Sequence, residues 1–457
     1  MITYSIIKKS QLEGAKRLDA EYYQPEYLEL EKRFDALETK TIDEISKSVI
    51  SFGAYSLTSH IEWQESGVPY VNVGDIHDGY IDFSNVKYIS ERVDEILKKS
   101  RINNGQVLLT MAGTIGNAAV VYNLPQSGNA NQAIAKITPS DIISPYYLAA
   151  FLNSKYGLLQ TQREIVSSVQ ANIFLGPIKK FKVPIFDRKM TEEVESKYQD
   201  FLKELEKSKS LYSQAENLLL EELGLKNFNE GQNLYSVVNL SNIKKANRID
   251  AEYFQPKYAK IISKLRNGIV KSLSEISTLI GHPTQSPYDE HGTIAVLAQK
   301  HMRHGLMVDT STFDNYTTED LIKKNDKKFI LKRGDILISS AGEPGLTCIW
   351  AKEGKVIPGS FVTIARLKNE LEPLYVGVFL NTIAGRLQFE REYTGSIQQY
   401  VYPVKMKNIL IPILPKPTQQ KIAELVRKSH ESRKKAKELL KEAKHKVEEL
   451  IEKVSGL

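Results

Sequence analysis

Two long segments of this chain carry hydrophobic residues at alternating spacings of three and four positions. They span residues 189–222 and 417–453, and no proline or glycine interrupts either segment after its first residue. This spacing places the apolar side chains on one narrow stripe of an α-helix, as in a coiled coil. We therefore predict two helices, each about 50 Å long at ~1.5 Å per residue. The stripes consist of Val194, Tyr198, Phe201, Leu205, Tyr212, Ala215 and Leu219, and of Ile422, Val426, Ser429, Ala436, Leu440, Ala443, Val447, Leu450 and Val454.

The two predicted helices have opposite charge balances. Residues 189–222 contain nine acidic and five basic residues, whereas residues 417–453 contain seven acidic and 11 basic residues. Opposite charge and a shared apolar stripe favour pairing of the two helices with each other. The alternative is that each helix packs separately on its own domain.

The rest of the chain, about 40–185 and 270–412, mixes short apolar runs with turn-forming residues. Val68–Val73, Gln106–Met111 and Asp335–Ser340 are typical of strands. The segments Pro145–Gln162 and Pro373–Glu392 each predict one helix. We expect two α+β domains of roughly 150 residues, each large enough for its own core.

The first part of the chain is repeated halfway along it. Residues 4–27 and 235–258 are identical at 12 of 24 positions without a gap, and Gly105–Leu109 resembles Gly334–Ile338. Further along, Ile134–Ile137 aligns with Ile364–Leu367. The period is far longer than the roughly 20–50 residues of a solenoid repeat, which indicates a tandem duplication. Two such modules can be related by an approximate two-fold axis, which suits a ligand such as duplex DNA.

These patterns predict four parts. They are a first domain (1–186, with a joint segment at 1–30), a central helix (187–226), a second domain (227–413, with a joint segment at 232–260) and a C-terminal helix (414–457). Tyr70–Asp82 and Ile294–Asp309 share little sequence although they occupy similar places in the two domains. The two domains share matching segments, but the sequences between these segments are unrelated. This pattern indicates one fold that binds two different targets.

Composition narrows the class of protein only slightly. The net charge of +7 and the pI of about 8.9 are compatible with nucleic-acid binding, but they also suit simple solubility. The one cysteine, Cys348, lies in an apolar strand pattern, which predicts a buried thiol and no intrachain disulfide. No apolar run near 20 residues and no signal-peptide pattern occurs, so we expect a cytoplasmic protein without a membrane segment.

Motifs for catalysis or cofactor binding are not found in the sequence. The glycine loops Ala112–Asn117 and Ala341–Gly345 lack the Lys-Ser/Thr of a phosphate-binding loop, so they predict tight turns between strands. His301 and His304 have no cysteine or carboxylate cluster at metal-ligand spacing, so we expect no metal site. We expect a binding protein that is not an enzyme and holds no cofactor.

Polar residues in predicted loops are the candidates for contact with DNA. Base edges are read by amide, hydroxyl, basic and carboxylate side chains, and phosphates by basic groups and backbone N–H groups. Simple solvation of a loop explains any one of these residues equally well. The candidates are Tyr55, Ser56, Thr58, Asn72, Asp75, His77, Asn131, Gln132, Ser168, Gln170 and Asn172 in the first domain, and His282, Thr284, Gln285, Gln299, Lys300, His301, Arg303, His304, Ser396, Gln398 and Gln399 in the second.

A repeated Arg-x-Asp pattern followed by aromatics predicts a structural joint in each half. The pattern consists of Arg17, Asp19 and Tyr22 in the first half and Arg248, Asp250 and Tyr253 in the second. We expect a salt bridge and tyrosine packing that seat each domain on the helices. A direct role in ligand binding is the less favoured alternative.

Taken together, the chain resembles the DNA-specificity subunits of type I restriction–modification systems. The resemblance is carried by the paired Arg-hydrophobic-Asp-Ala-Glu-Tyr segments, Gly113–Gly116, Asn131-Gln132, the Ser167–Gln170 and Gly395–Gln398 segments, and Pro417–Ala423 at the start of the last helix. It covers essentially the whole chain. Asp187–Met190 departs from the Pro/Gln-rich opening usual for the central helix, and Gly342–Gly345 departs from the Gly-Thr-Ile-Gly form.

This resemblance implies two target-recognition domains that each read one half of a bipartite DNA site, separated by an antiparallel coiled-coil spacer. Two methyltransferase subunits would dock on the spacer, and restriction/translocase subunits would join for cleavage. S-adenosylmethionine, ATP and Mg²⁺ would then belong to these partners. The alternatives are the specificity subunit of a related system whose single partner both methylates and cleaves, a duplicated scaffold that does not bind DNA, and an enzyme.

Overall fold

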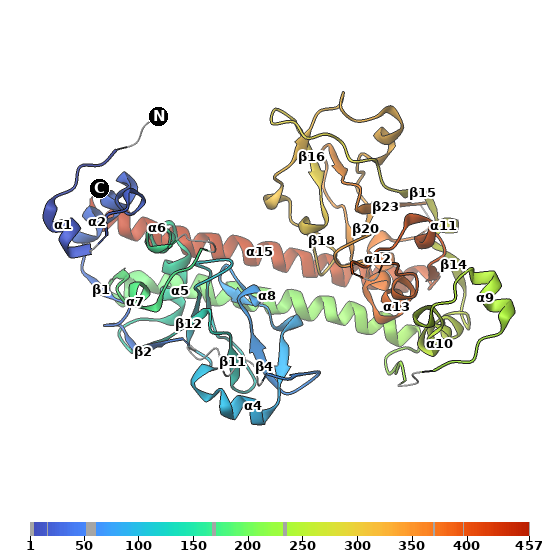
Figure 1. Ribbon diagram of the computed structural model, residues 1–457, viewed down its shortest axis with the longest axis horizontal. Coiled ribbons are helices and arrows are strands. Elements are labelled where there is room, and N and C mark those ends of the chain that lie inside the picture. Colours follow the sequence, from blue (N-terminus) through green and yellow to red (C-terminus); the bar gives the residue numbers. More distant parts are fainter. Residues whose placement is uncertain are drawn as a thin grey trace. The chain divides into compact units, whose positions relative to one another are not determined.

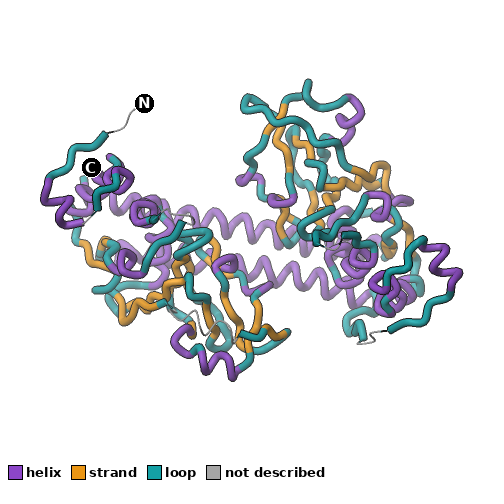
Figure 2. Tube along the Cα trace, viewed as in Figure 1, coloured by secondary structure: helices purple, strands orange, loops and turns teal. Residues whose placement is uncertain are grey.

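A computed structural model describes residues 4–15, 17–51, 61–166, 171–231, 235–368, 371–395 and 397–456 (Figures 1 and 2). The chain forms two compact units. Unit 1 contains Met1–Leu205 and Arg433–Leu457, and unit 2 contains Glu206–Ser432. The boundary between the units falls inside the two long helices, and each unit is described separately below.

The two long helices are present as predicted. Helix α8 spans Arg188–Glu222 and helix α15 spans Lys416–Ser455. Gly224 and Gly456 follow them with φ values of 64° and 65°, in the left-handed conformation that commonly ends a helix. In the described part of the chain, no helix is long and apolar enough to cross a membrane.

The helices pair with each other, antiparallel, within each unit. In unit 1 the Nζ of Lys197 lies 2.6 Å from a carboxylate oxygen of Glu442, and the Nζ of Lys446 lies 3.0 Å from Glu193. In unit 2 the buried hydroxyls of Ser208 and Ser429 are 3.1 Å apart. Partner numbers fall along α15 as they rise along α8, so the predicted pairing is confirmed.

The predicted apolar stripes are buried, except for Tyr212, which is partly buried, and Val454. Val454 is 47 % exposed. In the register set by the Lys197–Glu442 pair, Val454 lies opposite a position that precedes the first residue of α8. The stripe prediction is therefore wrong at the last turn of α15, because that turn extends past the end of its partner.

Unit 1 contains two larger sheets: one face of the first packs on α5 and the long helices, and its other face packs on the second sheet. One sheet has the order β10-β9-β12-β2 and the other has the order β3-β7-β4-β11-β8. The elements are α1 (Lys9–Ala15), α2 (Pro25–Asp35), β1 (Thr39–Thr41), β2 (Ser46–Ile50), β3 (Trp63–Gln64), β4 (Val68–Val71), β5 (Ile76–His77), β6 (Tyr80–Ile81), β7 (Lys87–Ile89), α4 (Glu91–Ile96), β8 (Arg101–Ile102), β9 (Val107–Thr110), β10 (Ala118–Val120), β11 (Gly128–Ala130), β12 (Ile134–Pro139), α5 (Pro145–Asn153), α6 (Lys155–Glu164), α7 (Leu175–Lys179) and β13 (Lys182–Pro184).

Unit 2 repeats this plan with a smaller second sheet. Its sheets have the orders β15-β23-β20-β21 and β19-β16-β22. The elements are α9 (Leu240–Ala246), α10 (Pro256–Leu265), β14 (Val270–Ser272), α11 (Leu273–Ile276), β15 (Ser277–Gly281), β16 (Ile294–Leu297), β17 (Met302–Arg303), β18 (Met307–Val308), β19 (Tyr316–Thr317), β20 (Ile336–Ser339), β21 (Thr347–Ile349), β22 (Val356–Pro358), β23 (Val362–Leu367), α12 (Pro373–Asn381), α13 (Ile383–Arg391), α14 (Pro403–Met406) and β24 (Leu410–Pro412).

One part of the repeat has a different register from the one that the sequence predicts. In unit 1 Ile134 pairs with Thr110, and in unit 2 Val362 pairs with Ser339. The strand partners therefore equate Ile134 with Val362, two residues before Ile364. The prediction was wrong because a shift of two residues keeps every side chain on the same face of a strand, so the hydrophobic pattern hardly changes.

Each predicted helix after the sheets is instead a pair of helices. The break falls at Ser154 in unit 1 and at Thr382 in unit 2, where ψ is 166° in both cases. The chain then turns so sharply that a Cβ on Gly157 would lie 2.4 Å from the Phe151 carbonyl. Apolar periodicity continues across the turn, so it does not reveal the break.

The glycine loops and the cysteine agree with their predictions. Gly113 and Gly116 have positive φ in the turn that joins β9 to β10, and Gly342 and Gly345 do the same between β20 and β21. Cys348 is buried in β21, where its thiol lies 3.0 Å from the Met307 carbonyl. The glycines therefore form turns, and the cysteine is part of the core.

Candidate nucleic-acid interface

Three loop segments of unit 1 meet at one edge of its sheets. The Asn131 N–H donates to the Val71 carbonyl (2.8 Å), next to Asn72. The Met111 N–H donates to the Ala133 carbonyl (2.8 Å), and Ala112 forms a bridge with Asn172. Backbone hydrogen bonds therefore bring together three asparagines that lie far apart in the sequence.

Local hydrogen bonds hold these asparagines in place. The Asn131 Oδ1 accepts from the Ala133 N–H (2.8 Å), which shapes the turn after β11. The Asn72 N–H donates to Asp75 Oδ2 (2.7 Å), and burial raises the pKa of the Asp75 carboxyl. The Gln132 Oε1 is buried and makes no hydrogen bond among the described residues. At this edge, hydrogen bonds hold the backbone in place around three asparagine side chains.

The same backbone frame occurs in unit 2 with different side chains. The Gly359 N–H donates to the Leu297 carbonyl, the Ser340 N–H donates to the Phe361 carbonyl (both 2.8 Å), and Ala341 forms a bridge with Tyr400. These bonds match those of unit 1 one for one. Gly359, Phe361 and Tyr400 therefore occupy the places of Asn131, Ala133 and Asn172.

An exposed aromatic cluster distinguishes unit 2 at this edge. The ring centroids of Phe361 and Tyr400 are 6.1 Å apart, and those of Tyr400 and Tyr402 are 4.6 Å apart. Phe361 is 56 % exposed and Tyr402 is 52 % exposed. The sequence analysis missed these aromatics because Phe361 precedes an apolar strand, where an aromatic residue is expected to be buried. The shifted alignment of the repeat also hid its match with Ala133.

Several predicted residues surround this cluster. The Ser360 N–H donates to Gln285 Oε1 (3.4 Å), which places Gln285 beside Phe361. Gln398 and Gln399 are exposed just before Tyr400. The Gln299 amide lies against Gly342, where an added Cβ would be 3.0 Å from its Oε1.

Other predicted residues of unit 2 have partners within the protein. The Thr284 hydroxyl donates to Asp326 Oδ2 (2.6 Å), and His282 Nδ1 lies 2.9 Å from the Pro283 carbonyl. The Arg303 guanidinium donates to the Met302 carbonyl (3.0 Å), and Lys300 forms an ion pair with Asp314. These contacts fold the loops, and DNA contact by these four residues stays a prediction.

One predicted histidine, His301, does not fit its predicted role. His301 has no exposed surface, its Nδ1 accepts from the Ala298 N–H (2.9 Å), and burial lowers the pKa of its imidazole. It supports the loop and cannot touch a ligand in this conformation. The His304 Nε2 lies 3.4 Å from a carboxylate oxygen of Glu343. This contact directs His304 toward the glycine turn between β20 and β21, and DNA contact by this exposed side chain stays a prediction.

The predicted loop that carries His77 forms the short hairpin β5–β6. The hydroxyl of Tyr198 on α8 donates to the Gly79 carbonyl (2.6 Å), and Asp78 forms a 2.6 Å ion pair with Lys444 on α15. The His77 ring stacks on Tyr80, with centroids 4.9 Å apart. The hairpin that carries His77 therefore docks on the long helices of unit 1. The predicted residues Tyr55, Ser56, Thr58, Ser168, Gln170 and Ser396 lie outside the described residues.

The repeated joint segments have the same construction in both units. Arg17 Nε donates to Asp19 Oδ1, and Arg248 Nε donates to Asp250 Oδ1, both at 2.8 Å. Each arginine also lies over the following tyrosine ring, at 4.6 Å for Tyr22 and 4.7 Å for Tyr253.

A second arginine covers each of these tyrosines. Arg163 of α6 lies 4.1 Å from the Tyr22 ring centroid, and Arg391 of α13 lies 4.2 Å from the Tyr253 ring centroid. These contacts seat the joints on α6 and α13, and the seating of the domains on the long helices stays a prediction.

Comparison with known proteins identifies the family. The sequence model of the type I restriction modification DNA specificity domain matches residues 35–216 and again residues 269–442. The chain belongs to this family. The double match agrees with the duplicated α+β architecture and with the resemblance noted in the sequence.

Individual relatives of this specificity-domain protein are distant. The chain is 30 % identical over 105 residues to the type I restriction enzyme EcoBI specificity subunit of Escherichia coli, a match that covers 22 % of each chain. The S subunit of M. genitalium is similar with a TM-score of 0.41 and 14 % identity over 91 % of this chain and 95 % of that one. The HsdS subunit of Thermoanaerobacter tengcongensis is similar with a TM-score of 0.29 and 13 % identity over 91 % and 96 %.

Proposed function

We propose that this chain is the DNA-recognition subunit of a type I restriction–modification assembly and that it performs no reaction itself. Each unit reads one half of a bipartite site in duplex DNA. Two methyltransferase subunits dock on the paired helices, and restriction/translocase subunits join them. S-adenosylmethionine, ATP and Mg²⁺ belong to those partners.

One observation carries this proposal. The same backbone frame holds Asn131, Ala133 and Asn172 in unit 1 and Gly359, Phe361 and Tyr400 in unit 2. Asparagine amides can pair with the N6 and N7 edge of adenine, whereas aromatic rings stack on bases or contact the methyl group of thymine. Equivalent positions with different chemistry suit two readers of two different sequences.

Methylome sequencing of the host tests the proposal. We expect one motif with two specified blocks and a gap of constant length, and we expect its methylation to disappear when this gene is deleted. Methylation that persists at every site after deletion would exclude the proposed role.

Selection from random duplex pools separates DNA recognition from the scaffold alternative. The complete chain, alone and with its methyltransferase partner, is mixed with random duplexes, and the bound fraction is sequenced. A recognition subunit enriches the bipartite motif, whereas a scaffold enriches no sequence. Copurification of one partner that both methylates and cleaves would identify the related system.

A further inference from the structure

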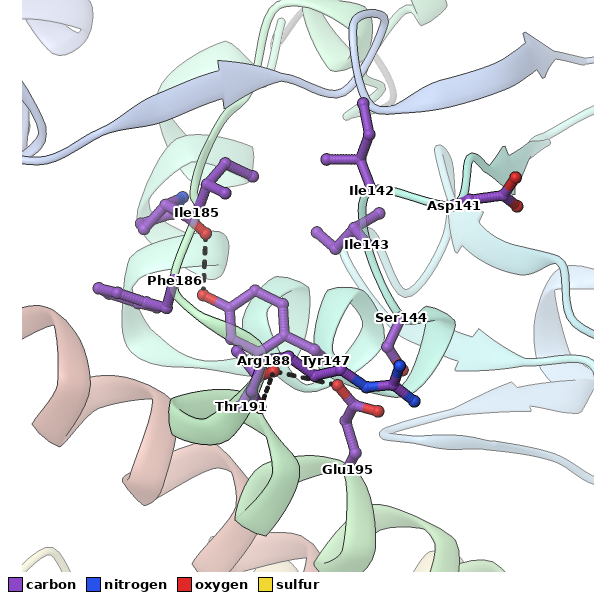
Figure 3. A pocket seen from close by; sticks show the side chains of 11 residues that line it. Asp141, Ile142, Ile143, Ser144, Tyr147, Ile185, Phe186, Arg188, Thr191 and Glu195 are labelled. Carbon is purple, nitrogen blue, oxygen red and sulfur yellow. Dashed lines mark hydrogen bonds between the residues drawn. The ribbon is translucent and has the colours of Figure 1, made fainter.

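Unit 1 contains a cavity of about 440 Å³ where the start of α5 meets the start of α8 (Figure 3). This volume is within the roughly 300–1,000 Å³ of ligand pockets. Ile142 and Ile143 line one side and Ile185 lines the opposite side. Tyr147 lies between them, and its hydroxyl donates to the Pro184 carbonyl (3.0 Å). The cavity therefore has apolar side chains on two sides, while Asp141, Ser144, Arg188, Thr191 and Glu195 make the rest of its lining polar.

In unit 2 a glutamine side chain occupies the equivalent place. The Tyr375 hydroxyl donates to the Pro412 carbonyl (2.8 Å), as Tyr147 does to Pro184, and this contact fixes the correspondence between the units. Gln419 is only 2 % exposed. Its Oε1 accepts from the Glu372 N–H (3.2 Å), and its Nε2 donates to the Leu414 carbonyl (2.8 Å).

In unit 1 the position of Gln419 is taken by Thr191, whose side chain is too short to make these bonds. The Thr191 hydroxyl lies 3.1 Å from both the Arg188 carbonyl and Glu195 Oε1, so it donates within its own helix. Ser144 and Phe186 correspond to Glu372 and Leu414. Among the residues that the structure describes, no hydrogen bond joins the Ser144 N–H or the Phe186 carbonyl to another group. A donor and an acceptor that hold an amide in unit 2 thus line an open cavity in unit 1.

We propose that this cavity binds a primary carboxamide on a short apolar stem, supplied from outside the chain. The carboxamide oxygen accepts from the Ser144 N–H, its nitrogen donates to the Phe186 carbonyl, and the stem lies against Tyr147 and the isoleucines. A neutral group fits because the charged lining residues have both signs, with Asp141 and Glu195 against Arg188. Burial of a neutral amide with both of its bonds made avoids the cost of an unpaired polar group.

The binding test uses the full chain and N-acetyl-glutamine N-methylamide, whose side chain is its single primary carboxamide, as the probe, followed by saturation-transfer NMR. Thr191→Gln places the side chain found in unit 2 between the Ser144 N–H and the Phe186 carbonyl, so we expect the probe signal to fall at least 10-fold. Gln419→Thr opens the second place, so we expect two binding sites per chain. N-acetyl-glutamate N-methylamide, which carries a carboxylate and no primary carboxamide, is the control and is expected to bind at least 10-fold more weakly.

Three results would overturn the carboxamide site. They are equal binding of the amide and carboxylate probes, equal binding by wild type and Thr191→Gln, and a crystal soaked with the probe that shows only water in the cavity. Thermal unfolding checks the fold of the variants. Thr191→Gln is expected to raise the unfolding midpoint, because the new side chain makes both missing hydrogen bonds.

The source of the carboxamide is either a free small molecule or an Asn or Gln side chain of an assembly partner. The second source rests on the proposed function. If Thr191→Gln abolishes probe binding and weakens assembly with the methyltransferase subunits at least 10-fold, a partner side chain enters the cavity. If it abolishes probe binding while assembly is unchanged, the ligand is a free carboxamide. If the probe binds but the methylome contains no bipartite motif, the proposed function is refuted and the carboxamide site still stands.

Discussion

The hydroxyl of Tyr198 on α8 donates a 2.6 Å hydrogen bond to the carbonyl of Gly79 at the tip of the β5–β6 hairpin. Both groups are buried, and this bond holds the β5–β6 hairpin against α8. We expect Tyr198→Phe to lower the free energy of unfolding by about 1 kcal/mol, because the Gly79 carbonyl loses its partner. Urea denaturation of the two proteins measures the difference, and equal midpoints would contradict it.

Gly79 lies where the backbone conformation and the neighbouring side chains both disfavour any residue with a Cβ atom. Its φ is 85°, and an added Cβ would lie 2.8 Å from a methyl group of Leu440 and 3.1 Å from the Phe201 ring. Gly105 is a matched control, because its φ is also 85° but nothing lies within 4 Å of its Cβ position. We expect Gly105→Ala to cost ~1 kcal/mol for the backbone conformation alone. Gly79→Ala is expected to cost at least ~1 kcal/mol more through steric crowding.

Glu216 on α8 makes the stability of unit 2 depend on pH. Burial raises the pKa of its carboxyl to about 7, although the nearby His304 opposes this effect. Between the ordinary carboxyl pKa of 4.5 and about 7, the folded protein holds a proton that the unfolded chain has released. The contribution of Glu216 to stability therefore falls as pH rises across this interval.

Glu216→Gln tests this pH dependence. The variant is expected to match wild type in urea denaturation at pH 4.5 and to be more stable than wild type at pH 8. Glu222→Gln, at an exposed position on the same helix, is the control and is expected to leave the difference between the two pH values unchanged. A Glu216→Gln curve parallel to wild type at all pH values would disprove the assignment.

A partly buried ion pair in unit 2, in which Asp335 is buried and Arg366 is 19 % exposed, replaces a neutral pair in unit 1. Arg366 donates to both carboxylate oxygens of Asp335 (2.8 and 2.7 Å), whereas Gln106 Nε2 donates to the Thr138 hydroxyl (2.9 Å). We expect Asp335→Ala to cost about 3–5 kcal/mol, because it leaves the Arg366 charge without its partner. Gln106→Ala is expected to cost ~1 kcal/mol. Chemical denaturation compares the two, and equal losses would refute the distinction.

The aromatic cluster of unit 2 predicts a specific loss of DNA binding. Removal of one ring that stacks on a base costs about 1–3 kcal/mol, so we expect Phe361→Ala to weaken binding of the cognate duplex about 10- to 100-fold. Tyr235→Ala removes an aromatic side chain that is 81 % exposed in the joint segment of unit 2, and it is expected to leave affinity unchanged. Gel shifts with the assembled complex measure both variants, and an equal loss from both would show that Phe361 has no special role.

The sequence alone determined the elements with long or repeated patterns. The spacing from Val194 to Leu219 and from Ile422 to Leu450 specified two helices and their buried faces, because a 3.6-residue period admits few other structures. The duplicated joint segments predicted two like domains, and the double family match agrees. The turn glycines and the buried Cys348 were also predictable, since each depends on its near neighbours in the chain.

Only the tertiary structure decided which equivalent positions differ in chemistry. The two-residue shift between Ile134 and Ile364 leaves strand periodicity intact, so hydrogen-bond partners were needed to match Ala133 with Phe361. The burial of His301 and the exposure of Phe361 likewise depend on loops that come from separate parts of the chain. Side-chain roles at such edges are set by long-range packing, which local sequence patterns do not encode.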